Sequence, residues 1–220
     1  MTAAARRGAG DRSPVVALTV TAGVAVASGL LLGWVLFSPE APGTDSAEAG
    51  FARDMSEHHA QAVDMSLIAL QRSDDREIDL LAYDIATTQG TQIGTMQGWL
   101  EQWDLPAARP EPRMAWMEKA MAGADSAVEP GDADYRPMPG MATTAEMDAL
   151  ESAPRDEVDV DYLEMMIRHH VAGVEMAQAA VESTDSPDVL RLAEAMVNGQ
   201  RREIELMESL LSDREARSDA

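Results

Sequence analysis

The sequence contains no cysteine and only four histidines among its 220 residues. Without cysteine there are no disulfides and no thiolate ligands, so an exported domain of this composition depends on a packed core for stability. Basic residues are also scarce: 17 lysines and arginines stand against 39 aspartates and glutamates, which gives a formal net charge of −22. A field of that sign repels nucleic acid and anionic lipid headgroups and gathers cations. The composition therefore excludes a nucleic-acid-binding protein.

The N-terminal residues differ in character from the rest of the chain. Three arginines precede residues 15–37, which carry no charge and are mostly apolar. A helix of this length, at about 1.5 Å per residue, spans a hydrocarbon core of about 30 Å. The positive-inside rule then places residues 1–14 in the cytoplasm and the remainder outside. We therefore predict a single-pass anchor in the cell membrane. The alternative is secretion after cleavage of a signal peptide, with a small-residue site at Ala47–Ala49.

The rest of the chain is an internal duplication. A shift of 111 positions aligns residues 51–100 with residues 162–211 without a gap, and 13 of the 50 aligned residues are identical. The histidine doublet His58–His59 falls on the doublet His169–His170 in this alignment. Each unit shows helical periodicity that is interrupted once, which is typical of a helical hairpin. The duplication therefore predicts an all-α four-helix bundle behind the N-terminal transmembrane helix.

Helix-capping residues locate the ends of the predicted helices. Ser186 before Pro187 is a favourable helix start, and Asp74 with Glu77 resembles a capping box. The predicted helices span about 47–72, 75–103, 156–183 and 187–213. The predicted organisation is a linker over 38–49, the duplicated domain over 50–212 and a tail over 213–220.

A long connector separates the two repeat units. Residues 104–142 hold six of the eleven prolines, which is unusual for a helix-to-helix connection. Its "RPMPGM" stretch contains Met138 and Met141, which are secondary candidates for metal binding. Directly after the connector, Thr143 and Glu146 form a plausible capping box for a short helix.

Each histidine doublet shares one helical face with two methionines and a small residue. At about 100° per residue this face is about 120° wide. In the first unit it consists of Met55, His58, His59, Ala62 and Met65. In the second unit it consists of Met166, His169, His170, Gly173 and Met176. Imidazole and thioether donors without thiolates suit Cu(I), Ag(I) and, through imidazole, Cu(II). We therefore predict that the histidines and methionines of both faces bind a metal ion, with copper as the expected ion.

The histidines and methionines of these faces have other interpretations besides metal binding. Methionines on an apolar stripe often fill a core, and inward histidines are often satisfied core polar groups. A metal-free interaction or stress-response module, whose protein partner the sequence does not indicate, is therefore the alternative. A ferritin-type di-iron site needs a Glu-x-x-His pair, and a zinc hydrolase needs His-Glu-x-x-His; neither pattern is present. No acid–base residue or substrate pocket is evident, so an enzyme is not predicted.

The second helix of each unit also carries polar residues at equivalent positions. We interpret them as packing on the helix face, with hydrogen bonding to the histidines as the alternative: Gln89, Gln92, Gln200 and Glu203.

The repeated motif "M-x-x-H-H-x-x-[AG]-V-[DE]-M", followed in each unit by "Q-x-x-[QE]-I-x-x-M-x-x-[WL]-L", resembles the domain-of-unknown-function 305 family. The "PGM" before the second unit is similar as well, and the resemblance covers residues 50–212. It implies a ferritin-like four-helix bundle that is exported or membrane-anchored. It also implies that some members bind copper outside the cytoplasm, through positions that correspond here to the doublets and their flanking methionines.

Overall fold

The computed structural model describes residues 23, 25–33, 41–108, 112–117, 138–155 and 157–218. Every regular element within these ranges is a helix. The chain divides into two compact units, Met1–Ala41 and Pro42–Ala220, and each is described by itself.

In the first unit, residues 25–33 form a helix. Apart from these and Gly23, the predicted span 15–37 lies outside the described residues. Within the part of the chain that the structure describes, no helix combines the length and the apolar character needed to cross a bilayer. The membrane anchor remains a prediction from the sequence.

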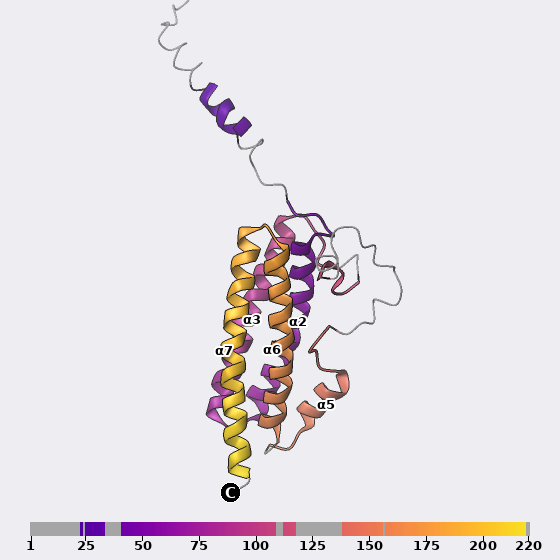
Figure 1. The fold of residues 1–220 in the computed structure, drawn as a ribbon, viewed down its shortest axis with the longest axis vertical. Coiled ribbons are helices and arrows are strands. Elements are labelled where there is room, and N and C mark those ends of the chain that lie inside the picture. The colour runs from indigo at the N-terminus through magenta and orange to yellow at the C-terminus, as the bar shows by residue number, and fades with distance from the viewer. Residues whose placement is uncertain are drawn as a thin grey trace, which may run out of the picture. The chain divides into compact units, whose positions relative to one another are not determined.

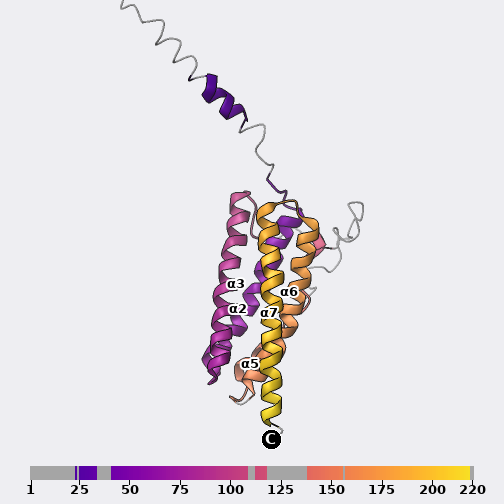
Figure 2. The same cartoon turned by 60° about the vertical axis from the view of Figure 1, so that its left-hand side comes forward.

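The second unit is the predicted four-helix bundle (Figure 1). Its long helices are α2 (Ala47–Arg72), α3 (Arg76–Gln102), α6 (Val158–Ser183) and α7 (Pro187–Ser218). A short helix, α5 (Thr144–Ser152), precedes the second hairpin. Helix α2 packs against α3 and α6, α6 packs against α7, and α5 packs against both α2 and α6 (Figure 2). Two hairpins, one from each repeat unit, therefore meet along α2 and α6.

The helix starts follow the capping residues, with one correction. The capping box of Thr143 and Glu146 at α5 is confirmed. The start of α3 was predicted wrongly, because its N-cap is Asp75 rather than Asp74: Oδ1 of Asp75 accepts from the backbone N–H of Glu77 at 2.8 Å. The side chain of Asp74 instead pairs with Arg155 at 2.7 Å. Both aspartates pair with an arginine distant in sequence, and Asp75 alone also caps the helix.

Helix α7 continues to Ser218, beyond its predicted end at about 213. Arg214 explains part of the extension. Its guanidinium donates to Oδ2 of Asp75 at 2.6 Å and lies 3.7 Å from Oδ2 of Asp159. Through Arg214, the C-terminal part of α7 therefore contacts the starts of α3 and α6.

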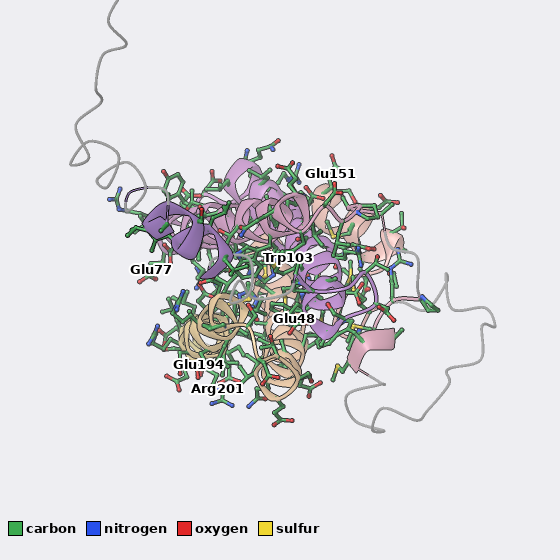
Figure 3. The ribbon with its side chains drawn as sticks, turned by 90° about the horizontal axis from the view of Figure 1, so that it is seen from above. Glu48, Glu77, Trp103, Glu151, Glu194 and Arg201 are labelled. Carbon is green, nitrogen blue, oxygen red and sulfur yellow. The ribbon has the colours of Figure 1, made fainter. Side chains whose placement is uncertain are left out.

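The core shows that α2 and α6 run antiparallel. One cluster joins Phe51 near the start of α2 to Ala180 near the end of α6. The other joins Ala69 near the end of α2 to Tyr162 near the start of α6. Acidic residues cover the outside, as the exposed side chains of Glu77 and Glu194 show at the periphery of the bundle in Figure 3. This arrangement places the middle of α2 opposite the middle of α6, where the histidine doublets lie.

Candidate metal centre

The two histidine doublets meet in the centre of the bundle. The ring centroids of His58 on α2 and His169 on α6 are 3.7 Å apart, with an interplanar angle of 30°. The rings of His169 and His170 lie 6.3 Å apart. All four histidines are at most 1% exposed. We call this group the histidine layer (His58, His59, His169 and His170).

Two histidines at equivalent positions in the repeat have equivalent partners on the second helices. Nε2 of His59 lies 2.8 Å from Oε1 of Gln92 on α3. Nε2 of His170 lies 3.0 Å from Oε2 of Glu203 on α7. In each pair the oxygen accepts, so the ring carries its hydrogen on Nε2 and keeps a lone pair on Nδ1. Gln92 and Glu203 thus hydrogen-bond to the histidines, where the sequence favoured packing on the helix face.

The connector supplies the partner of a third histidine. Nε2 of His58 lies 3.3 Å from the backbone carbonyl oxygen of Pro139. The next residue, Gly140, has a φ of +74° and sits so close to α6 that an added Cβ would lie 2.8 Å from the carbonyl oxygen of Arg168. Only glycine fits both the backbone conformation and this contact. The "PGM" sequence therefore brings a carbonyl to the histidine layer, which the side-chain pattern alone did not reveal.

Each histidine also has a buried ring nitrogen without a hydrogen-bond partner among the described residues. These atoms are Nδ1 of His58, His59 and His170, and Nε2 of His169. A buried polar atom left unpaired costs about 1–3 kcal/mol, so four in one layer are unusual. An imidazole that donates one N–H to a carbonyl or carboxylate and holds the other nitrogen free is the usual arrangement of a metal-binding histidine. The donor atoms of this layer therefore fit a metal ion.

The electrostatics keep these rings in the form that binds metals. Burial lowers the pKa of His58 to about 4. Burial also lowers the pKa of His59 to about 3. For His169, burial and then the neighbouring His58 hold the pKa well below its usual value. These imidazoles are therefore neutral at neutral pH, and a neutral imidazole has the lone pair that a metal requires.

Methionines lie on both sides of the histidine layer. Met55 and Met176 belong to one core cluster, and Met65 and Met166 belong to the other. All four are at most 1% exposed. Along each of the two antiparallel helices, one methionine precedes the doublet and one follows it. The structure thus brings every residue of the two predicted faces into one continuous buried region.

The secondary candidates join this region. Met138 is 2% exposed and belongs to the same core cluster as Met55 and Met176. Met141 is partly buried and packs against that cluster. The connector methionines therefore extend the methionine-rich core beyond the histidine layer, whereas the sequence suggested a separate, weaker site.

Sequence reasoning missed Asp54, which anchors the connector. Its Oδ2 accepts from the backbone N–H of Met114 at 2.8 Å and from Nε1 of Trp116 at 3.0 Å. Trp116 in turn covers Gly50, where a Cβ would lie 2.5 Å from the indole ring. An acidic residue on the buried side of α2, only 3% exposed, is the signal that could have revealed this contact.

The histidines are close together, yet they do not form a ready-made cage. Among the described residues, no three histidine, aspartate or glutamate side chains converge in a way that could hold a metal ion. The rings of His58 and His169 are tilted by 30° and lie with their faces close together, 3.7 Å apart between centroids. An ion bound here would therefore take thioether ligands as well, or require a ring to turn.

The fold and the buried layer define a duplicated four-helix bundle with a histidine- and methionine-rich centre. Residues 48–211 match the family model described as "Domain of unknown function (DUF305)". The chain belongs to this family, as its sequence motifs predicted. No curated protein matches the sequence.

Solved structures of similar proteins share the fold. A DUF305 protein from Streptomyces coelicolor is 46% identical, with a TM-score of 0.69 over 78% of this chain and 96% of that chain. A DUF305 fragment from Deinococcus radiodurans is 32% identical, with a TM-score of 0.62 over 80% of this chain and 99% of that chain. CopM in its Cu(II)-bound form is 25% identical, with a TM-score of 0.58 over 76% of this chain and 97% of that chain. CopM has also been solved with Cu(I), at 25% identity and a TM-score of 0.56 over 76% of this chain and 96% of that chain.

Proposed function

We propose that this protein binds copper, as Cu(I) or Cu(II), in order to sequester the ion or pass it on. The observation that carries the proposal is the set of four buried ring nitrogens without partners in the histidine layer. Three of the rings donate their other nitrogen to Pro139, Gln92 or Glu203. The proposed ligands are His58, His59, His169, His170, Met55, Met65, Met166 and Met176, with Met138 and Met141 as further thioether donors.

The chemistry of these donors supports copper over harder ions. Thioethers and imidazoles without thiolates suit Cu(I), and the imidazoles alone suit Cu(II). The similarity to CopM, which has been solved with both oxidation states of copper, points to the same class of ion. The proposal also places the bundle outside the cytoplasm, tethered through residues 15–37 or released from them by cleavage. That part rests on the arginines and the apolar run in the sequence.

An anaerobic Cu(I) competition titration of the full chain tests the proposal. The double variant His59→Gln/His170→Gln removes two imidazoles, while each new amide can still donate toward Gln92 or Glu203. Loss of a hydrogen-bond partner of a metal ligand costs about 10–100-fold in affinity, so we expect the loss of two ligands to lower the Cu(I) affinity at least about a hundredfold. Circular dichroism should show unchanged helical content. Equal affinities of the two proteins would refute the histidine layer as the site.

The alternative function is a metal-free bundle whose histidines stabilise the core and whose surface binds another protein. The stacking of His58 on His169 and the lack of a converging carboxylate or histidine cage in the described residues favour it. Thermal melts separate the two functions. A ligand that binds only the folded state raises the midpoint in a dose-dependent way, because it adds about 2.7 kcal/mol to the free energy of unfolding at a hundredfold excess over Kd. A midpoint that does not change with Cu(I) would support the metal-free module.

A further inference from the structure

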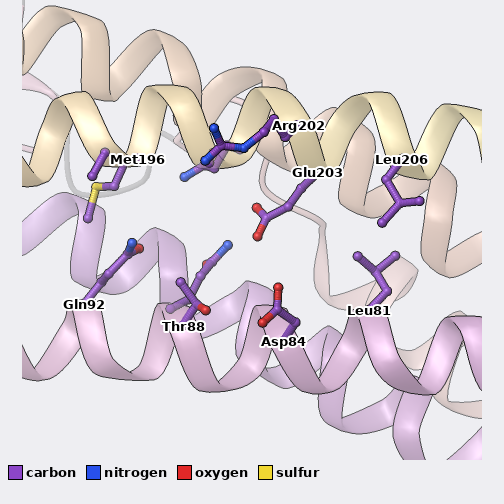
Figure 4. A pocket seen from close by; sticks show the side chains of 12 residues that line it. Leu81, Asp84, Thr88, Gln92, Met196, Arg202, Glu203 and Leu206 are labelled. Carbon is purple, nitrogen blue, oxygen red and sulfur yellow. The ribbon is translucent and has the colours of Figure 1, made fainter.

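A groove of about 480 Å³ lies between α3 and α7 (Figure 4). The opposite pair of helices, α2 and α6, is covered by α5. Polar side chains from both α3 and α7 line the groove, and several of them occupy equivalent positions in the two repeat units. The groove therefore opens on the side of the bundle that α5 does not cover.

Two buried glutamines in the groove have unpaired oxygens. Gln89 on α3 is 3% exposed and its repeat equivalent Gln200 on α7 is 4% exposed. Oε1 of each has no hydrogen-bond partner among the described residues, and both side chains line the groove. Nε2 of Gln89 lies 3.4 Å from Nε2 of His170, so this wall of the groove reaches the histidine layer. Buried amide oxygens without a donor are available to a cation.

The groove also contains the residues that hydrogen-bond to the layer. Gln92, which contacts His59, and Glu203, which contacts His170, both line it. Figure 4 shows the carboxylates of Asp84 and Glu203 pointing toward each other across the groove. A cation that approaches from solvent would thus meet the exposed carboxylate of Asp84 before it reaches the buried amide oxygens and the carboxylate of Glu203, which contacts His170.

On the basis of the proposed function, we propose that this groove is the route by which the metal ion passes between solvent and the histidine layer. Carboxylates in a negatively charged protein raise the local concentration of cations. The unpaired oxygens of Gln89 and Gln200 replace part of the hydration shell as the ion moves inward. Glu203 then gives up its hydrogen bond from His170 to let the ion pass. Arg202 also lines the groove, so its charge opposes the approach of a cation.

A bulky side chain introduced into the groove tests whether the ion passes through it, without changing any proposed metal ligand. Gly199 lines the groove on α7, and a Cβ added there meets no atom within 4 Å. Gly199→Phe therefore fills the groove, while Thr88→Phe does so from the facing helix. Gly90→Phe is the control, because Gly90 is also helical and free of neighbours within 4 Å, yet it is exposed and lies outside the groove lining.

The measurement is stopped-flow transfer of Cu(I) between a chromophoric chelator and the full chain, together with the equilibrium Kd. A blocked route slows binding and release by the same factor, so both groove variants should be at least about tenfold slower in each direction with Kd unchanged. The control should match the parent chain. Parent-like rates in both groove variants would overturn the route, and so would a weaker Kd that arises from faster release. If the parent chain binds no Cu(I), the proposed function itself fails, and the route fails with it.

Discussion

The burial of neutral histidines should make the metal-free protein sensitive to mild acid. His59 is fully buried and burial lowers its pKa to about 3. The unfolded chain has an ordinary histidine pKa of about 6.5, so between pH 7 and pH 5 the unfolded state takes up a proton that folded His59 does not. The unfolded state then binds more protons, and the free energy of unfolding falls as the pH falls.

The size of the effect follows from the two pKa values. Between pH 7 and pH 5, His59 alone should cost about 2 kcal/mol of stability, and His58, with a pKa of about 4, should cost a similar amount. Carboxylates titrate mostly below this window, with ordinary pKa values of about 4, so the histidines dominate the change. The free energy of unfolding is therefore highest, as far as these two histidines are concerned, above pH 6.5, and it falls progressively below that pH.

His59→Gln isolates this contribution, because glutamine does not titrate and can still donate to Gln92. The assay is urea unfolding of the metal-free chain, followed by circular dichroism at pH 7, 6 and 5. We expect the variant to lose about 2 kcal/mol less than the parent chain across this range. The quantity compared is the change in the free energy of unfolding between pH 7 and pH 5, so a change in stability that is the same at every pH cancels. A difference between parent and variant that is the same at all three pH values would refute the reasoning.

Two further predictions concern the connector and the methionines. Gly140→Ala forces a side chain into a positive-φ position and against the backbone of α6. It should destabilise the chain by about 1–3 kcal/mol in urea unfolding, whereas Gly90→Ala, in open space on a helix, should be neutral or stabilising. Met166→Leu removes a proposed thioether ligand at nearly constant volume and should weaken Cu(I) binding about tenfold, while the neighbouring core substitution Met165→Leu should leave it within about twofold. Equal affinities of these two variants would show that Met166 only fills the core.

The helix starts and the buried helix faces could be predicted from the sequence, because each depends on residues that are close together in the chain. Helix starts at Thr143 and Pro187 follow from residues within one turn of the chain. The buried face of each first helix follows from the helical repeat, and the exposure of Asp64 and Glu175 on the opposite face agrees with it. The N-cap of α3 was mispredicted by one residue, because two adjacent aspartates can both cap a helix here and the sequence does not separate them; Asp75 accepts from the backbone N–H of Glu77.

Features that depend on packing between the two helical hairpins could not be predicted from the sequence. The sequence placed each doublet on a buried face, but it could not show that His58 and His169 stack on each other. That contact depends on the antiparallel pairing of α2 with α6, which no local pattern encodes. The carbonyl of Pro139 was missed for a related reason: a backbone oxygen carries no side-chain signal, and only the close approach of Gly140 to α6 brings it to His58.

The two halves of the histidine layer are similar in shape but differ in charge. His59 has the neutral amide of Gln92 as its partner, whereas the repeat-equivalent His170 has the carboxylate of Glu203, which is 18% exposed. The second doublet therefore has an acidic side chain beside it where the first has an amide. Carboxyl groups attract cations more strongly than neutral amides do. Under the proposed function, the divergence of Gln92 and Glu203 between the repeats therefore makes the His170 end of the layer the more attractive one for a cation.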